Sequence, residues 1–169
     1  MNKKIVLAGG CFWGLEDLIK SQTGVINTEV GYTGGNNKNP TYENHDGHAE
    51  AVEIEYDSEK TSYKKLLDFF FQIHNPTTLN QQGNDRGTSY RSAIFYGNEE
   101  EKKDGEDFID IVNRSKRWED PVVTKLEPLK KFYRAEEYHQ DYLQKNKGGY
   151  TCHAIYFDSY LSGEQANKE

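Results

Sequence analysis

The spacing of apolar residues along the chain predicts an alternation of short strands and helices. Five segments are each predicted to form one strand, because their apolar residues are continuous or alternate with polar ones. They are residues 4–8, 25–32, 48–56, 92–96 and 122–126. Helical spacing with start and stop signals occurs at residues 12–23, 63–74, 99–117 and 136–145. A further strand is expected around residues 155–157, before a terminus that frays through Glu169. We find no internal repeat or linker, so residues 1–169 are expected to form a single domain.

The junction of the first strand and first helix is the most informative about chemistry. It reads Gly9-Gly10-Cys11-Phe12-Trp13-Gly14, which places Cys11 at or just before the first helical turn. Because the positive end of the helix dipole favours a thiolate, we expect a lowered pKa and a reactive sulfur. The preceding glycines let a substrate approach the backbone, and Phe12 and Trp13 suggest the wall of an apolar pocket. The alternative is an inert, buried cysteine between core aromatic residues.

A carboxyl group is expected on the apolar face of the strand at residues 48–56. Val52, Ile54 and Tyr56 share one face of this strand, and two other glutamates take the opposite face. Counting back in the same register places Glu50 on the apolar face. Because burial penalises the charged form, the pKa of Glu50 should be raised, and a neutral carboxyl near pH 7 can donate a proton. The alternative is a solvated glutamate at the mouth of the strand.

Two long polar loops and a glycine-containing segment complete the candidate regions. The loop at residues 33–47 is too long for a plain connection, and such loops are usually functional. The loop at residues 81–91 contains Asp85 and Tyr90, for which ordinary turn and strand positions are the simpler interpretation. Glycines precede Cys152, so the segment from about residue 146 is expected to be mobile.

Composition and charge exclude several classes of function. A formal charge of −7 gives no phosphate-binding footprint and argues against nucleic acid as a partner. No apolar run approaches the length of a membrane span or of a secretory signal, so a soluble, cytoplasmic protein is expected. Hydrophobic residues make up only 34% of the chain, but 12 Tyr, 8 Phe and 2 Trp supply apolar surface for a core.

The chain has two cysteines, Cys11 and Cys152, near its opposite ends. A structural disulfide closing so long a loop would contribute roughly 5 kcal/mol in the chain-entropy model. In a reducing cytosol such a bond does not persist, and a cysteine pair there is more often catalytic or redox-active. Two isolated cysteines without clustered histidines do not predict a metal site.

Several motifs, taken in order, carry a resemblance to a known family that covers nearly the whole chain. Besides the junction at Cys11 they are Gly31-Tyr32-Thr33-Gly34-Gly35, Asn39-Pro40-Thr41-Tyr42, Gly47-His48-Ala49-Glu50-Ala51-Val52, Asp85-Arg86-Gly87-Thr88-Ser89-Tyr90-Arg91 and Ala135-Glu136-Glu137-Tyr138-His139-Gln140-Asp141-Tyr142. Together they resemble the A-type peptide methionine sulfoxide reductases. This resemblance implies an α+β fold, with a mixed sheet and packed helices in a ferredoxin-like sandwich.

The resemblance also implies roles for the residues at the first junction and the third strand. Cys11 matches the nucleophile that attacks the sulfur of a methionine S-sulfoxide, free or within a protein. Phe12 and Trp13 match the apolar walls around the methyl group on that sulfur. Glu50 matches the acid that protonates the departing oxygen, in agreement with the strand register. A thiolate and a neutral carboxylic acid at one site require opposite pKa shifts.

The remaining roles concern the sulfoxide oxygen and the recycling of the enzyme. Tyr42 and Tyr90 match hydroxyls that bind the sulfoxide oxygen, and Asp85 matches a polar group that orders the site. The sulfenic acid formed on Cys11 would condense with Cys152 to a disulfide, which thioredoxin or another dithiol would reduce. The resemblance implies no bound cofactor and no metal, and we expect a monomer.

Three other classes compete with this interpretation. A thiol peroxidase would use the same cysteine on hydroperoxides, although peroxide cleavage does not obviously require the acid at Glu50. A cysteine hydrolase needs a histidine partner for Cys11, and no histidine is tied to it by spacing. A non-catalytic, tyrosine-rich binding module should keep its function when Cys11 is replaced by Ser.

Overall fold

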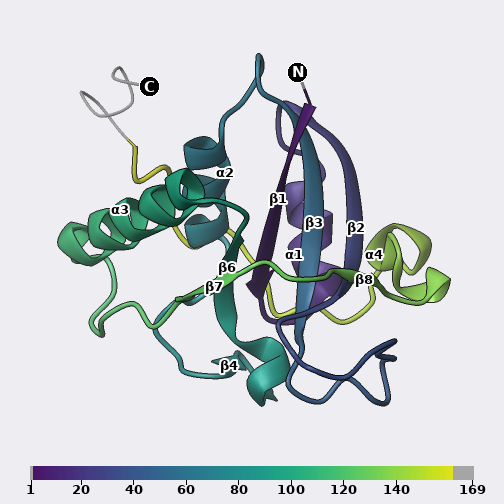
Figure 1. Cartoon of the computed structure of the whole chain (residues 1–169). Coiled ribbons are helices and arrows are strands. Elements are labelled where there is room, and N and C mark those ends of the chain that lie inside the picture. Colours follow the sequence, from purple (N-terminus) through teal and green to yellow (C-terminus); the bar gives the residue numbers. More distant parts are fainter. Residues whose placement is uncertain (1, 162–169) are drawn as a thin grey trace.

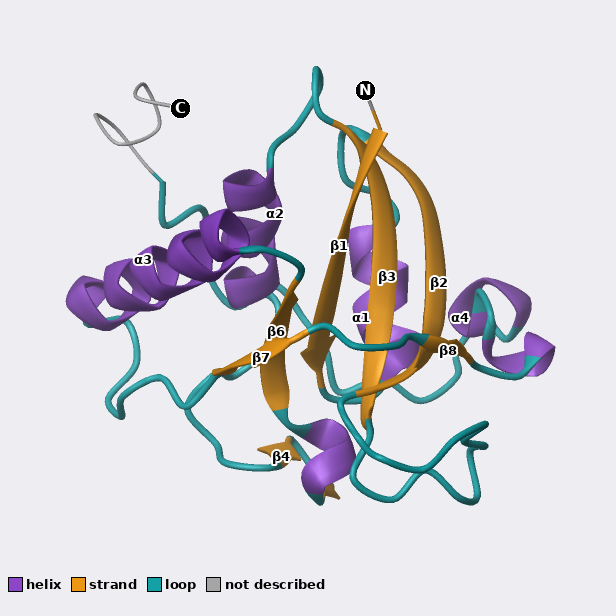
Figure 2. Ribbon diagram, viewed as in Figure 1, coloured by secondary structure: helices purple, strands orange, loops and turns teal. Residues whose placement is uncertain are grey.

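A mixed six-stranded sheet organises the molecule, with strand order β7-β6-β1-β3-β2-β8 (Figures 1 and 2). The computed structural model describes residues 2–161. The sheet strands are β1 (Asn2–Gly9), β2 (Val25–Thr33), β3 (Ala49–Asp57), β6 (Ser92–Tyr96), β7 (Lys125–Pro128) and β8 (Tyr133–Arg134). β4 (Gln81–Gln82) and β5 (Asp85–Arg86) form a separate hairpin. The α-helices are α1 (Phe12–Ile19), α2 (Tyr63–Gln72), α3 (Glu99–Ser115) and α4 (Tyr142–Lys145), and the short 3₁₀ turns are η1 (Thr88–Tyr90) and η2 (Glu137–His139).

The two faces of the sheet are covered differently, as the alternation of side chains along its strands requires. In β1, Ile5 and Leu7 point into the main core, which they share with α1, α2 and α3. Val6 and Ala8 point to the opposite face, where a smaller apolar cluster packs against Leu129 and Phe132. The helix-covered face therefore contains most of the core, and α2 and α3 lie beside one another against it (Figure 2). The α+β class expected from the resemblance is confirmed.

Strand direction brings four strand ends to one edge of the sheet. β3 pairs antiparallel with both β1 and β2, and β6 pairs antiparallel with β1. β1 and β2 therefore end where β3 and β6 begin, at the lower edge in Figure 1. The loop at residues 33–47, the β4–β5 hairpin and η1 gather at this edge, so it combines glycines, polar loops and a helix start.

Helix starts follow the signals in the sequence. Ser62 caps α2 by accepting a hydrogen bond from the Lys65 N–H (3.1 Å), and Asn98 caps α3 through the Glu101 N–H (2.8 Å). Three glutamates in the first turn of α3 complement the helix dipole. α3 ends at Ser115, where Lys116 adopts a left-handed conformation with φ 60°.

Two predicted strands differ from the structure. The strand expected at residues 122–126 is shifted along the chain to β7, Lys125–Pro128. The N–H groups of Val122 and Val123 donate to Asn113 Oδ1 and Pro76 O, so these two residues do not pair with the sheet. The strand expected at residues 155–157 is wrong. The Tyr156 N–H instead bonds Gln72 O, and the ring of Trp118 packs on Tyr156 and Phe157.

The continuous helix predicted at residues 136–145 is also wrong, because the structure has two short helical segments there. Only the 3₁₀ turn η2 and the four-residue α4 form there. Asp141 interrupts them with φ 53°, a left-handed conformation that no α-helix contains. This kink directs Tyr142 toward α1 and leaves Tyr138 56% exposed.

The C-terminal segment crosses the helix side of the sheet. After α4 it passes the start of α1 and then reaches α2, where Ser159 and the Tyr160 N–H bond the carboxylate of Asp68 (Figure 1). The fraying expected through Glu169 concerns residues beyond 161, outside the described residues. Across residues 2–161, no helix combines the length and the apolar character needed to cross a bilayer.

Candidate active site

Cys11 lies at the junction of β1 and α1, as its N-cap residue. Gly10 turns the chain there with φ 99°, and a Cβ on it would meet the side chain of Gln82 at 2.7 Å. A side chain at position 10 is therefore excluded by both conformation and space. Cys11 is buried, with 6% of its surface exposed.

Glu50 lies beside this junction on β3, opposite Tyr32 of β2, and is 1% exposed. Its Oε1 accepts a hydrogen bond from the Phe12 N–H (3.2 Å), at the start of α1. Its Oε2 has no hydrogen-bond partner among residues 2–161. Burial, and secondly the charge of Asp85, raise the pKa of Glu50 to about 8 against the effect of the Phe12 N–H. The buried position and raised pKa expected from strand register are confirmed.

The expectation of a lowered pKa at Cys11 is wrong. Burial and the neighbouring Glu50 carboxylate raise the pKa of Cys11, and the Trp13 N–H at the helix start opposes them only in part. The Trp13 N–H lowers the pKa of Cys11, as expected for a helix start, but desolvation raises that pKa by more. In the resting protein at neutral pH, Cys11 is therefore a thiol, and most Glu50 side chains are protonated.

The two aromatic residues after Cys11 occupy different environments. Phe12 is fully buried, with its ring against Tyr32 (centroids 5.7 Å apart) and His139 (5.1 Å). Trp13 is half-buried and lies flat on Tyr142, with ring centroids 3.8 Å apart. Its indole N–H donates to His139 Nδ1 at 2.9 Å, which fixes the orientation of the ring.

Tyr42 and Tyr90 reach the same site from two different loops. The Tyr42 ring is 6.5 Å from that of Trp13 (centroids) and 38% exposed, and its N–H bonds Glu136 Oε2 (2.9 Å). Tyr90 is half-buried in η1. Burial, followed by the charge of Glu50, raises the pKa of both hydroxyls, so both remain protonated hydrogen-bond donors.

The second cysteine lies close to Asp85 at the β4–β5 hairpin. Cys152 Sγ is 3.7 Å from Gln82 O and 3.8 Å from Asp85 Oδ2, which also accepts the hydroxyl of Tyr150 (3.2 Å). Both Asp85 and Cys152 contribute to the raised pKa of Cys11. The structure thus brings together all eight candidate residues of the sequence, namely Cys11, Phe12, Trp13, Tyr42, Glu50, Asp85, Tyr90 and Cys152.

Several residues at this site have no assigned role in the sequence interpretation. Glu136 joins two elements, because its carboxylate accepts both the Tyr42 N–H and the Tyr32 hydroxyl (2.8 Å). His139 and Tyr142 hold Trp13, as described above. The helical spacing of Tyr138 and Tyr142 gives a weak signal for this region, but only the break at Asp141 directs Tyr142 onto Trp13.

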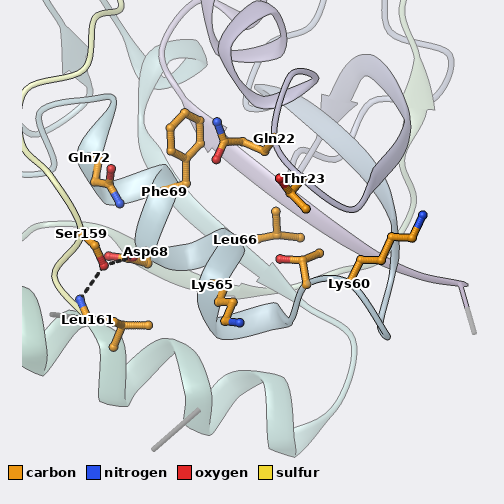
Figure 3. Close-up of a pocket in the computed structure, with 11 residues that line it drawn as sticks. Gln22, Thr23, Lys60, Lys65, Leu66, Asp68, Phe69, Gln72, Ser159 and Leu161 are labelled. Atoms are coloured by element: carbon orange, nitrogen blue, oxygen red, sulfur yellow. Dashed lines mark hydrogen bonds between the residues drawn. The ribbon is translucent and has the colours of Figure 1, made fainter. Parts of the chain in front are cut away.

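A larger pocket lies elsewhere and contains none of these residues. It measures about 480 Å³ and lies between α2, the α1–β2 connection and residues 159–161 (Figure 3). Its lining combines lysines, amides and a few apolar side chains, without a cysteine or a histidine. A smaller pocket of about 120 Å³ includes Tyr42 and His45, at the edge of the candidate site. The candidate site is therefore defined by its reactive side chains and not by the larger cavity. Within residues 2–161, no group of side chains is suited to hold a metal ion.

The site combines a buried thiol, a protonated carboxyl group and a second free cysteine nearby. These groups are typical of a thiol-dependent oxidoreductase. Comparisons with known proteins agree with this class. The sequence model of the peptide methionine sulfoxide reductase family matches residues 3–167. The peptide methionine sulfoxide reductase MsrA of Nocardia farcinica is 59% identical over 165 residues, covering 98% of this chain and 97% of that protein. The MsrA of Mycobacterium tuberculosis is 58% identical over 154 residues, 91% of this chain and 85% of that protein.

Solved structures give the same result for the fold. Reduced Mxr1 from Saccharomyces cerevisiae matches with a TM-score of 0.84 at 36% identity, covering 91% of this chain and 92% of that chain. Methionine sulfoxide reductase A of Corynebacterium diphtheriae matches with a TM-score of 0.84 at 32% identity, covering 89% and 77%. The chain belongs to the peptide methionine sulfoxide reductase family. Its activity is the reduction of methionine sulfoxide to methionine.

Proposed function

We propose that Cys11 is the nucleophile and Glu50 the proton donor in the reduction of methionine S-sulfoxide. Cys11 Sγ attacks the sulfoxide sulfur and forms a transient S–S bond. The oxygen is then transferred from the substrate sulfur to Cys11 Sγ as that S–S bond breaks, which leaves a sulfenic acid on Cys11 and releases methionine. Glu50 protonates the departing oxygen, and the thiol proton of Cys11 restores the neutral carboxyl, so no net proton is consumed. The observation that carries this proposal is the buried Glu50, whose pKa is raised to about 8 beside the thiol.

Substrate binding is proposed to use the aromatic residues around the thiol. Trp13, held flat by Tyr142, forms the apolar wall for the methyl group on sulfur, and Phe12 lies beneath it as the floor. The hydroxyls of Tyr42 and Tyr90 donate hydrogen bonds to the sulfoxide oxygen. Their raised pKa values keep both hydroxyls protonated for this purpose.

Recycling is proposed to proceed through a Cys11–Cys152 disulfide. Cys152 attacks the sulfenic sulfur, water leaves, and an external dithiol of the thioredoxin type reduces the disulfide by thiol–disulfide exchange. Asp85 lies 3.8 Å from Cys152 Sγ and contributes to the electrostatics of both sulfurs. A structure of yeast Mxr1 in complex with Trx2 matches this chain with a TM-score of 0.64 at 28% identity, which supports a reductant of this kind. The mobility expected from about residue 146 would let Cys152 close on Cys11.

We also propose a finer description of the fold and setting. The order β6-β1-β3-β2, its antiparallel pairing, and α1 and α2 on one face support a ferredoxin-like sandwich. The two free cysteines support a reducing compartment such as the cytoplasm. We propose a monomer that acts on protein-bound methionine sulfoxide, as the family match suggests, and on free methionine sulfoxide.

A thiol count tests the proposal directly. Reduced protein is mixed with N-acetylmethionine sulfoxide in the absence of reductant, and free thiols and released N-acetylmethionine are measured together. We expect loss of both thiols with release of about one equivalent of product. Cys11→Ser should release none while keeping the fold, as judged by circular dichroism. Substantial turnover by this variant would remove Cys11 as the nucleophile.

A further inference from the structure

His153 follows Cys152 in the chain and packs against the start of α1, at Gly9, Gly10 and Gly14. Its side chain is buried, and its Nε2 lies 2.6 Å from the carbonyl oxygen of Gly9. A Cβ on Gly14 would lie 2.6 Å from His153 Nδ1, and one on Gly10 would lie 3.4 Å from Cε1. The absence of a side chain at Gly14 therefore leaves space that the imidazole and Thr151 occupy.

Hydrogen bonding fixes which nitrogen of His153 carries the proton. A carbonyl oxygen only accepts hydrogen bonds, so the Nε2 facing Gly9 must be protonated. Burial lowers the pKa of His153, which keeps the ring neutral at pH 7. Nδ1 consequently carries a lone pair, and it lies 4.0 Å from Cys152 Sγ, within the reach of a sulfur hydrogen bond. The thiol of Cys152 thus has a nitrogen base beside it.

The charges around this pair favour a proton on the imidazole over a bare thiolate. Asp85 raises the pKa of Cys152, after burial, and so opposes a negative sulfur. The same carboxylate raises the pKa of His153 and so favours an imidazolium. The other titratable groups that face the pair are His74, whose pKa His153 lowers, Tyr150, which donates to Asp85, and Tyr156 and Cys11, whose pKa values Cys152 raises.

We propose that His153 is the general base that deprotonates Cys152 as it attacks the sulfenic acid of Cys11. This inference rests on the disulfide step proposed above. The Cys152 proton passes to Nδ1, the S–S bond forms, and the Cys11 S–O bond breaks. The imidazolium gives this proton to the departing hydroxide, which leaves as water, so His153 is neutral again at the end and the step is balanced. The reduction of methionine sulfoxide precedes this step and does not use His153.

Single-turnover kinetics of His153→Gln separate the two steps. Gln retains an N–H for the Gly9 carbonyl but cannot accept a proton. After mixing with one equivalent of N-acetylmethionine sulfoxide, product release should keep the wild-type rate, and disulfide formation should slow by about 10²-fold. The sulfenic acid should accumulate and be trapped by dimedone. Disulfide formation by this variant at the wild-type rate would overturn the proposal.

His48→Gln is the matched control, because His48 is also buried (1% exposed, against 8% for His153) and its two ring nitrogens face the loop backbone at Gly35 N and Asn37 O. It should form the disulfide normally. If His153→Gln unfolds, His153→Gly with added imidazole replaces it. Recovery of the disulfide rate with rising imidazole supports the proposal, and a folded variant without recovery contradicts it. Wild-type protein that releases no product would instead contradict the proposed function.

Discussion

Glu50 and Cys11 form a coupled pair of buried acids that share a single site. Ionised Glu50 raises the pKa of Cys11, so the thiolate is least accessible when the carboxyl is charged. In the proposed mechanism, protonated Glu50 supplies the proton for the leaving oxygen, and its neutral form no longer repels a thiolate at Cys11. This state also disfavours a thiol peroxidase, which depends on a resting thiolate at its cysteine.

The catalytic role of Glu50 is tested by Glu50→Gln. Gln retains the side-chain length and an oxygen for the Phe12 N–H but has no acidic proton. We expect single-turnover product release to slow by about 10²–10⁴-fold. In the wild-type protein this rate should fall as pH rises through about 8, where Glu50 ionises. A near-normal rate for the variant, with the pH dependence intact, would refute the role.

The raised pKa of Glu50 also predicts a dependence of stability on pH. Between the ordinary pKa of about 4.5 and the folded value of about 8, only the folded protein binds this proton. The stabilisation is complete at low pH and is lost as pH rises through this window, by roughly 2–5 kcal/mol. Urea unfolding of wild-type protein and Glu50→Gln from pH 5 to 9 should show the difference. Parallel curves for the two proteins would contradict it.

At the scale of elements, the start of α1 meets four separate parts of the chain. β3 contributes Glu50, the β4–β5 hairpin contributes Gln82, the η2–α4 region holds Trp13, and residues 151–153 pack on Gly14. Each of these contacts removes water from the sulfur. At Cys11 the helix start lowers the pKa and desolvation raises it, and desolvation is the larger effect because four parts of the chain surround the junction.

Gly14→Ala tests the contact between α1 and the C-terminal segment. The added Cβ would lie 2.6 Å from His153 Nδ1 and closer still to Thr151, so residues 151–153 must move outward. We expect disulfide formation to slow by about tenfold or more, since small misplacements of reacting groups are costly. Product release in the first turnover should change little. Gly97→Ala, whose Cβ meets only Glu101 at 3.5 Å, is the control. Equal disulfide rates in both variants would disprove the role of this packing.

At the scale of the whole molecule, the fold brings Cys152 into the neighbourhood of Cys11, although the two residues are far apart in the sequence. The strand that leads to Cys11 lies at the centre of the sheet, while Cys152 follows the last helix and returns across the start of α1. Beyond it, the segment is tied to α2 through Asp68. Cys152 therefore lies between the start of α1, where residues 151 and 153 pack on Gly14, and the attachment of residues 159–160 to α2.

Cys152→Ser tests whether this long-range contact is needed for recycling. The variant should still release about one equivalent of product, because the proposed reductive step does not use Cys152. Turnover linked to thioredoxin should be lost, since no disulfide forms for it to reduce. The measurement is NADPH consumption with thioredoxin and its reductase, beside a single-turnover assay. Normal linked turnover would mean that the sulfenic acid is reduced directly.

The sequence by itself determined the features that depend on local pattern. Strand alternation placed Glu50 on the apolar side of β3, and the glycines with the following apolar spacing placed Cys11 at the start of α1. Backbone geometry alone fixes both, because side-chain direction repeats every two residues in a strand and every 3.6 in a helix. The family motifs added the expected chemistry.

Only the tertiary structure decided the protonation state of Cys11, the break at Asp141 and the position of β7. It also decided that His153 lies against Cys152. A pKa sums the desolvation and charge contributed by every neighbour, including residues far away in the sequence. Strand pairing and helix continuity likewise depend on which partners are available in space. The spacing of residues along the chain does not identify these long-range partners, so the features that depend on them can be read only from the folded structure.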